Sequence, residues 1–222
     1  MFAVVFISPK KSFGRARRME RSGKLPVILL AVVVAAYGIS AIGPYDRLAW
    51  VGQSTPAVLY VVLLVVMFPR FRFSNFAYVL VFVHVLLLLY GAHFTYSNNP
   101  LFDRLAEIFG WERNYFDRVG HFAQGFVPAF LFKEFYVHGG YVKRGKILTL
   151  IVILSCLGLS AAYELGEFAL VRLLEVPIDA VMGTQGDIFD SYWDMIWALV
   201  GAVIAMVGLG RAHDAILDRF EI

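Results

Sequence analysis

Long apolar stretches, almost free of charge, constrain the fold of this 222-residue chain more than any other feature. Five of them run over residues 25–42, 51–68, 76–94, 147–163 and 195–209. Each approaches or reaches the ~20 residues that an α-helix needs to cross the hydrocarbon core of a bilayer. Hydrophobic residues make up 59% of the chain and charged residues 17%, whereas a soluble domain is about half apolar and about a quarter charged. The sequence therefore predicts an all-α integral membrane protein.

A sixth stretch, residues 119–137, is more polar but remains rich in Phe and Val. Because polar side chains of a membrane helix usually face the protein interior, we expect it to span the bilayer with one face buried in a bundle. The sequence thus predicts six transmembrane helices in one membrane domain, residues 25–211, between a basic leader, residues 1–24, and a short cytoplasmic tail, residues 212–222. Met19 would also make a sensible start.

Lys and Arg residues concentrate in the leader and in the loops that follow the stretches 51–68 and 119–137. Such residues in short loops mark the cytoplasmic side. Both termini are therefore expected in the cytoplasm, and the long connections 96–118 and 170–192 on the opposite side. Within the first connection, residues 101–109 are expected to form a helix at the membrane interface.

Acidic and histidine side chains are predicted to meet at the extracytoplasmic end of the last three helices. Asp117 and His121 are four residues apart and share one face of the fourth helix. Glu164 lies about 26 Å above Ile147 on the fifth helix, and Glu167 follows one turn later. The region before the sixth helix adds Asp187, Asp190 and Asp194, which share a face if the helix begins at Asp187.

Ionised groups near hydrocarbon are costly, so they usually face a cavity, pair with cations or mark a functional pathway. Carboxylates with an imidazole suit a divalent cation such as Mn, Mg or Zn, which would activate a water or hold a phosphate. The candidate metal ligands are Asp117, His121, Glu164, Glu167, Asp187, Asp190 and Asp194. The candidate catalytic residues are His121, Glu164 and Asp194.

Structural roles compete with this hypothesis. Asp187 and Asp190 suit the start of a helix, where carboxylates complement its dipole. Asp117 has Arg113 and Arg118 close in sequence as ion-pair partners. Glu164 and Asp194 would be structural if they paired with Arg172 or with His121. The spacing of these residues matches no established catalytic, phosphate-binding or nucleic-acid-binding motif, and the single Cys156 provides neither a disulfide nor a thiolate cluster.

Three runs of residues carry a family resemblance. They are residues 116–122 (FDRVGHF), 163–167 (YELGE) and 183–195 (GTQGDIFDSYWDM). They closely resemble the YjdF-like family of uncharacterised bacterial inner-membrane proteins, and the similarity covers nearly the whole chain after the leader. The resemblance implies a multi-pass protein of the bacterial inner membrane, and it implies no particular activity.

A looser similarity is to the VanZ-like proteins, which are associated with glycopeptide resistance. That family has an Asp-Lys/Arg-x-x-His pair, a later helical Glu and an Asp-x-x-x-Asn-x-x-Gly helix. The residues that match this order are Asp117, Arg118, His121, Glu164, Asp194 and Gly201. Ala198 stands where the family has the Asn, so the similarity does not transfer a detailed chemistry.

The favoured functional hypothesis is a polar site that binds a divalent cation or a polar headgroup and acts on a lipid or lipid-linked envelope substrate. A proton-coupled transporter and a non-catalytic membrane scaffold are the alternatives. The expected partner is the lipid bilayer, and nucleic acid is not expected. The identity of the metal, the substrate and the oligomeric state stay open.

Overall fold

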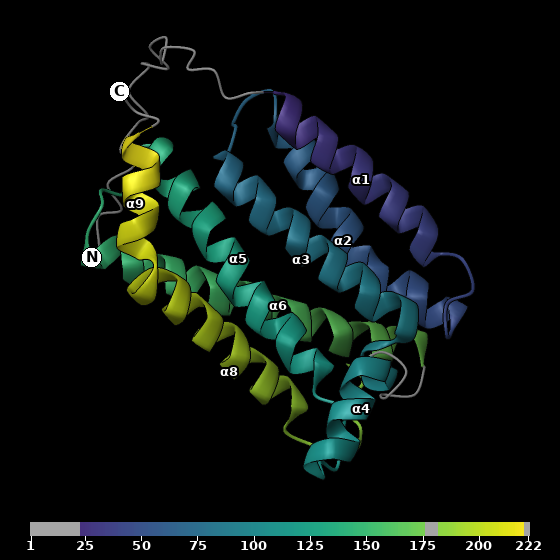
Figure 1. Cartoon of the computed structure of the whole chain (residues 1–222). Coiled ribbons are helices and arrows are strands. Elements are labelled where there is room, and N and C mark those ends of the chain that lie inside the picture. Colours follow the sequence, from purple (N-terminus) through teal and green to yellow (C-terminus); the bar gives the residue numbers. More distant parts are fainter. Residues whose placement is uncertain (1–22, 176–181, 220–222) are drawn as a thin grey trace.

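The computed structural model describes residues 23–175 and 182–219, and this part of the chain is helical and contains no strand. Most of the predicted leader, part of the connection at 170–192 and the last three residues lie outside the described residues. Figure 1 shows the helices as one bundle. In chain order they are α1 (Lys24–Ser40), α2 (Arg47–Met67), α3 (Asn75–Phe94), the 3₁₀ turn η1 (Tyr96–Asn98), α4 (Pro100–Phe109), α5 (Phe116–His138), α6 (Lys146–Leu174), α8 (Asp190–Val203), the π-helical turn η2 (Ile204–Gly208) and α9 (Gly210–Asp218).

Polar residues between the apolar stretches fix where several helices begin. The Asp46 side chain accepts a hydrogen bond from the Ala49 amide (2.7 Å), and the Ser74 side chain accepts one from the Ala77 amide (3.1 Å). Such caps satisfy amides that have no partner within the helix. Helix α4, the expected interfacial helix, begins after Asn99 and ends at Gly110, whose φ of +67° favours glycine.

Four segments are long and apolar enough to cross a membrane, by length and composition: Arg47–Met67, Asn75–Phe94, Lys146–Leu173 and Asp190–Gly208. Helix α1 is a shorter apolar helix of 17 residues. Helix α5 has 23 residues, and its Arg118, Lys133 and Glu134 are buried within the protein. The predicted all-helical membrane class is therefore confirmed. That the protein has six membrane spans and that both termini lie in the cytoplasm stay predictions.

Two helix boundaries differ from the sequence expectation. Helix α6 continues to Leu174, beyond the apolar stretch that ends at residue 163 and into the connection expected to begin at residue 170. At ~1.5 Å per residue its 29 residues are about 44 Å long, which exceeds the ~30 Å of a hydrocarbon core. The region expected to be a short tail instead contains α9, whose His213 and Leu217 are buried.

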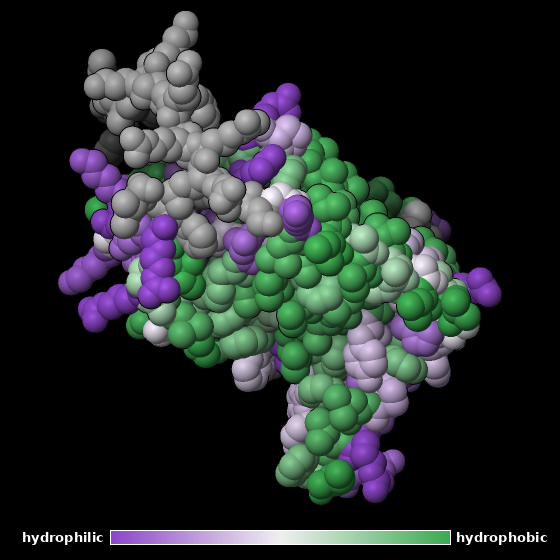
Figure 2. Space-filling model, turned by 45° about the horizontal axis from the view of Figure 1, so that its top comes forward, coloured by the Kyte–Doolittle hydropathy of each residue, from purple (hydrophilic) through white to green (hydrophobic). Residues whose placement is uncertain are grey.

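Helix α5 lies at the centre of the bundle. It packs most closely against α8 and also contacts α3 and α6, whereas α1 and α2 each pack on α3. One apolar core joins α1, α2, α3 and α5, and a second joins α5, α6 and the end of the last span. Hydrophobic side chains also dominate the surface of the bundle seen in Figure 2, as expected for a face in contact with lipid.

Glycines allow α5 and α8 to approach closely. A Cβ atom built on Gly125 would lie 1.7 Å from the Ala198 carbonyl oxygen, and one on Gly201 would lie 2.2 Å from that of Phe122. Small residues commonly permit such contacts between membrane helices. This packing brings the polar face of α5 against the start of α8.

A buried polar cluster fixes α9 at the other end of α5. The Glu134 carboxylate accepts hydrogen bonds from the Ser74 amide (2.7 Å) and the Ser74 hydroxyl (2.5 Å), and it lies 3.0 Å from His213 Nε2. Next to it, Lys133 Nζ lies 2.8 Å from Asp214 Oδ1. These contacts join α9 to α5 and to the start of α3.

Candidate functional site

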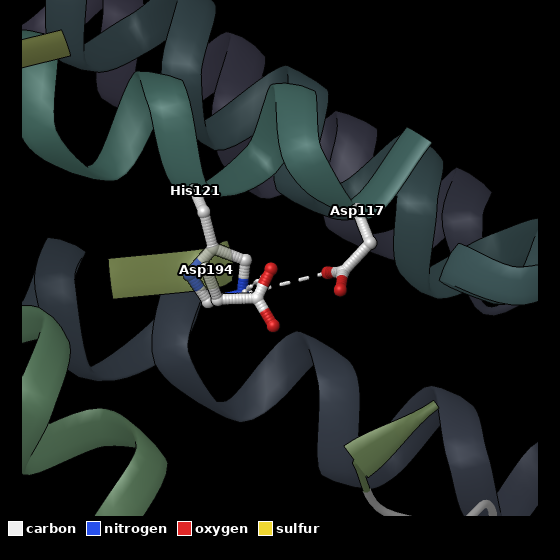
Figure 3. Close-up of side chains that lie close together, drawn as sticks. All are labelled: Asp117, His121 and Asp194. Carbon is white, nitrogen blue, oxygen red and sulfur yellow. Dashed lines mark ion pairs between the residues drawn. The ribbon is translucent and has the colours of Figure 1, made fainter. Parts of the chain in front are cut away.

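His121 lies at the centre of the polar cluster formed by α5, α6 and α8. Its Nδ1 is 3.0 Å from Gln124 Oε1, one turn later on α5. With the Gln124 amide in this orientation, its oxygen accepts a hydrogen bond from Nδ1–H, and Nε2 then presents a lone pair when the ring is neutral. Nε2 faces Asp117 Oδ1 at 3.5 Å, Asp194 Oδ1 at 3.7 Å and Glu164 Oε1 at 3.8 Å. Figure 3 shows His121 with Asp117 and Asp194.

These distances suit atoms that share a cation better than atoms that share a hydrogen bond. An N–H···O bond spans about 2.7–3.2 Å, which is shorter than all three. A metal ion with tetrahedral bonds of about 2.1 Å holds neighbouring ligand atoms ~3.4 Å apart. Asp117, His121 and Asp194 each offer one ligand atom, and these atoms lie within 4.8 Å of one another. The geometry therefore fits a small cation after slight contraction.

Arg118 fixes two of the acids beside α5. Its guanidinium forms an ion pair with Asp194 and lies 2.5 Å from Asp190 Oδ1. It also approaches Asp117 Oδ2 at 3.9 Å. The Arg118 side chain is only 6% exposed, so the start of α8 is attached to α5 by a buried ion pair.

Arg113 holds the segment that enters α8. Its guanidinium lies 3.3 Å from Asp187 Oδ2 and 2.8 Å from Asp190 Oδ1. Helix α8 begins at Asp190 rather than at Asp187. Asp187 precedes it, and its Oδ1 accepts a hydrogen bond from the Phe189 amide (2.9 Å). Both acids therefore lie at a helix start, as the structural alternative from the sequence anticipated, and they also have cationic partners, which it did not anticipate.

Glu164 differs from these acids because no described cation pairs with it. Its side chain is 6% exposed, and its Oε1 has no hydrogen-bond partner within the described residues. Arg172, which the sequence offered as its ion-pair partner, is exposed. Glu167, one turn beyond Glu164, is half-buried and hydrogen bonds to Tyr163. Glu164 is thus a buried acceptor directed at His121.

The described cluster has an excess of negative charge. It contains the six predicted carboxylates, of Asp117, Glu164, Glu167, Asp187, Asp190 and Asp194, beside the guanidinium groups of Arg113 and Arg118 and one imidazole. Grouped acids in a buried site must be offset by cations or must take up protons.

A second polar network holds the loops next to the cluster. Gln185 Oε1 accepts from the Asn114 amide and Gln185 Nε2 donates to the Asn114 carbonyl, each at 3.0 Å. The Asn114 side chain donates in turn to Asp103 Oδ1 (2.7 Å) and to the Asn99 carbonyl (2.9 Å). This network joins the start of α4 and the loop that follows α4 to the segment before α8, and it supports Arg113 beside Asp187.

Sequence reasoning brought the right acids together but assigned some partners incompletely. Arg113 and Arg118 were considered only for Asp117, whereas their shortest contacts are with Asp190 and Asp194. The role of Gln124 was missed, although its spacing of three residues from His121 places both on one helix face. His93 Nδ1 lies 2.9 Å from the Ser40 carbonyl oxygen, a contact that joins α3 to α1.

The fold and the cluster define a polytopic, all-helical membrane protein with a buried histidine–carboxylate site at the start of α5 and α8. The chain belongs to the family described as predicted membrane protein (DUF2238), whose family model matches residues 25–215. It is 36% identical over 195 residues to inner membrane protein YjdF of Escherichia coli (strain K12), which covers 88% of this chain and 92% of the relative. No solved structure matches the chain.

The family assignment confirms the predicted YjdF-like resemblance and agrees with the apolar helices. The chain is therefore a multi-pass protein of the inner membrane. The looser similarity to VanZ-like proteins stays a prediction.

Proposed function

We propose that the protein binds one divalent cation between α5, α6 and α8. The ligands are His121 Nε2 and the carboxylates of Asp117, Glu164 and Asp194. The observation that carries the proposal is the set of three carboxylate oxygens within 3.8 Å of an imidazole nitrogen whose ring is oriented by Gln124. One nitrogen and three oxygen donors suit Zn²⁺ or Mn²⁺. The cation would also offset the excess of negative charge.

The remaining acids have a supporting role in this proposal. Arg113 and Arg118 hold Asp187 and Asp190 and so place the start of α8 against α5. Arg118 also orients Asp194 toward the imidazole. Glu167 lies at the edge of the cluster, where it is half-buried, hydrogen bonds to Tyr163 and lies near Glu164 and Asp117. The ligand set therefore narrows from seven candidates to four.

The site is assigned to the extracytoplasmic half of the membrane. In this proposal α5 crosses the bilayer as a sixth span, because its charged residues are buried within the protein. Both termini are then cytoplasmic. The basic loops after α2 and α5 support this orientation. Residues 1–24 then form the cytoplasmic leader, residues 25–211 the membrane domain, and residues 212–222 the cytoplasmic end that contains α9.

The substrate class is a lipid or lipid-linked envelope molecule that carries a phosphate or another polar group. A bound cation holds such a group or polarises a water molecule. A carboxylate of the cluster that does not bind the cation would accept the proton from that water. Exposed aromatic residues near the start of α8, Tyr192, Trp193 and Trp197, provide contacts at the level of lipid headgroups.

Metal analysis of protein purified without chelator tests the proposal. The parent is expected to hold about one equivalent of a divalent cation or to take it up after dialysis. Glu164→Gln and His121→Ala are expected to lose it, and Glu107→Gln, at an exposed pair with Arg104, should keep it. If the parent takes up no divalent cation, the proposal fails.

A proton relay is the second candidate, because the same three carboxylates around His121 would serve a protonated imidazole. It predicts proton movement into liposomes that Glu164→Gln abolishes, with no metal bound. The metal analysis therefore separates the two functions.

A further inference from the structure

Helix α4 has two chemically different sides. Its charged residues, Asp103, Arg104 and Glu107, gather on one side, where Arg104 and Glu107 form an exposed ion pair. At about 3.6 residues per turn, the apolar residues of the helix fall together on the opposite side. They are Leu101, Phe102, Leu105, Ala106, Ile108 and Phe109. Such a division is typical of a helix that lies between water and an apolar surface.

The protein covers only one edge of the apolar side of α4. Phe102 packs on Phe116, the first residue of α5, with ring centres 5.5 Å apart. The residues that stay most exposed are Leu101 (55%), Ile108 (61%) and Phe109 (63%). Among the described helices, none packs closely along α4. Isolated helices shorter than ~12–15 residues are marginal in water, so the ten-residue α4 gains stability from whatever covers this face.

The position of α4 indicates that a lipid surface covers the exposed apolar face. The helix begins at Pro100, shortly after the span Asn75–Phe94 ends, so it is tethered at the boundary of the bilayer. In the view of Figure 1 it runs across the direction of the long helices, as a helix in the membrane plane does. Trp111, just after the helix, stacks on Phe109 with ring centres 5.2 Å apart, and aromatic rings are enriched at this boundary. The face therefore continues the lipid-facing surface of the bundle.

We infer that the apolar face of α4 binds the surface of the bilayer and thereby anchors the loops beside the polar cluster. The anchor acts through Asn114, whose buried side chain donates to Asp103 Oδ1 (2.7 Å) and to the Asn99 carbonyl (2.9 Å). The Asn114 backbone pairs in turn with the side chain of Gln185, in the segment before α8. A lipid surface that holds α4 therefore also holds the start of α8. None of these contacts involves a proposed cation ligand, so the anchor is independent of the cation site.

Fluorescence quenching of the full-length protein in phosphatidylcholine nanodiscs tests the membrane contact. Cys156 is buried, so a thiol-reactive fluorophore labels an introduced cysteine, with the unsubstituted protein as the blank. Ile108→Cys places the label on the apolar face, and Glu107→Cys places it on the charged side. Nitroxide-labelled lipid should quench the label at residue 108 at least about threefold more than that at residue 107, and iodide in the water should quench in the reverse order. Equal quenching of both labels by iodide would overturn the inference. So would a label at residue 108 that neither quencher reaches, because a protein partner would then cover the face.

Hydrogen exchange in the same nanodiscs tests the anchor. Ile108→Gln combined with Phe109→Gln makes the apolar face polar, whereas Arg104→Gln combined with Glu107→Gln places the same two side chains on the charged side. The first double variant should exchange the amides of residues 111–116 and 183–190 about tenfold faster than the parent, because local opening becomes easier. The second should match the parent, and exchange within α3 should be unchanged in both, which excludes general misfolding. Parent-like exchange of residues 111–116 and 183–190 in the first variant would overturn the anchor.

Discussion

Replacing Asp194 by Asn removes one of the two carboxylates that hydrogen bond to the buried guanidinium of Arg118. Breaking a buried ion pair costs about 3–5 kcal/mol. Asp190 remains 2.5 Å from Arg118, so we expect a loss of about 3 kcal/mol, the lower end of that range. For a chain of this size each kcal/mol shifts the melting temperature by about 2–4 °C. Asp194→Asn should therefore lower it by roughly 6–12 °C.

Glu164→Gln makes the same chemical change in a different setting. No described cation pairs with Glu164, and its neighbours Asp117 and Asp194 are also acids. Removing its charge relieves repulsion, so the melting temperature should stay within about 3 °C of the parent or rise. The assay is thermal unfolding of both variants and the parent in one detergent without added metal. A fall in Glu164→Gln as large as that in Asp194→Asn would refute the reasoning and favour a purely structural cluster.

Three further predictions concern the packing of α5 against α8, the attachment of α9 and the orientation of the chain in the membrane. Gly125→Ala places a methyl group against the Ala198 carbonyl and should destabilise the protein by about 3 kcal/mol in thermal unfolding, whereas Gly158→Ala, with nothing within 4 Å, should not. Glu134→Ala leaves Ser74 and His213 without their shared acceptor, at a cost of about 2 kcal/mol, and should expose α9 to limited proteolysis. Reporters fused after Ile222 and near Lys143 should read as cytoplasmic and one near Asn98 as extracytoplasmic; the opposite pattern would reverse the proposed orientation.

The sequence predicted the helices well because apolar length directly reflects the thickness of a bilayer. It predicted the convergence of His121, Glu164 and Asp194 because helix rise fixes the depth of each residue. It could not give the rotation of α8 about its axis, which decides that Arg118 pairs with Asp194 and Asp190. That rotation follows from the register of Gly125 against Ala198, a contact 73 residues apart in the chain.

The boundaries that sequence reasoning missed have a common cause. Charge was used as the sign that an apolar stretch ends, but the buried Glu164 and the half-buried Glu167 lie within α6, which continues to Leu174. Likewise the polar residues of α9 suggested a tail, whereas His213 and Asp214 have buried partners in Glu134 and Lys133. Such long-range pairs cannot be read from local composition.

X-ray absorption of the metal-loaded protein tests the central claim most directly, because it reports the ligands of the bound ion. With Zn²⁺ bound we predict four nitrogen or oxygen neighbours at about 2.0–2.2 Å, with the outer-shell scattering of one imidazole. His121→Ala, which is expected to lose the ion, should show neither bound metal nor this imidazole signal after the same treatment. A parent spectrum without imidazole scattering, or one unchanged in His121→Ala, would contradict a cation site built around His121.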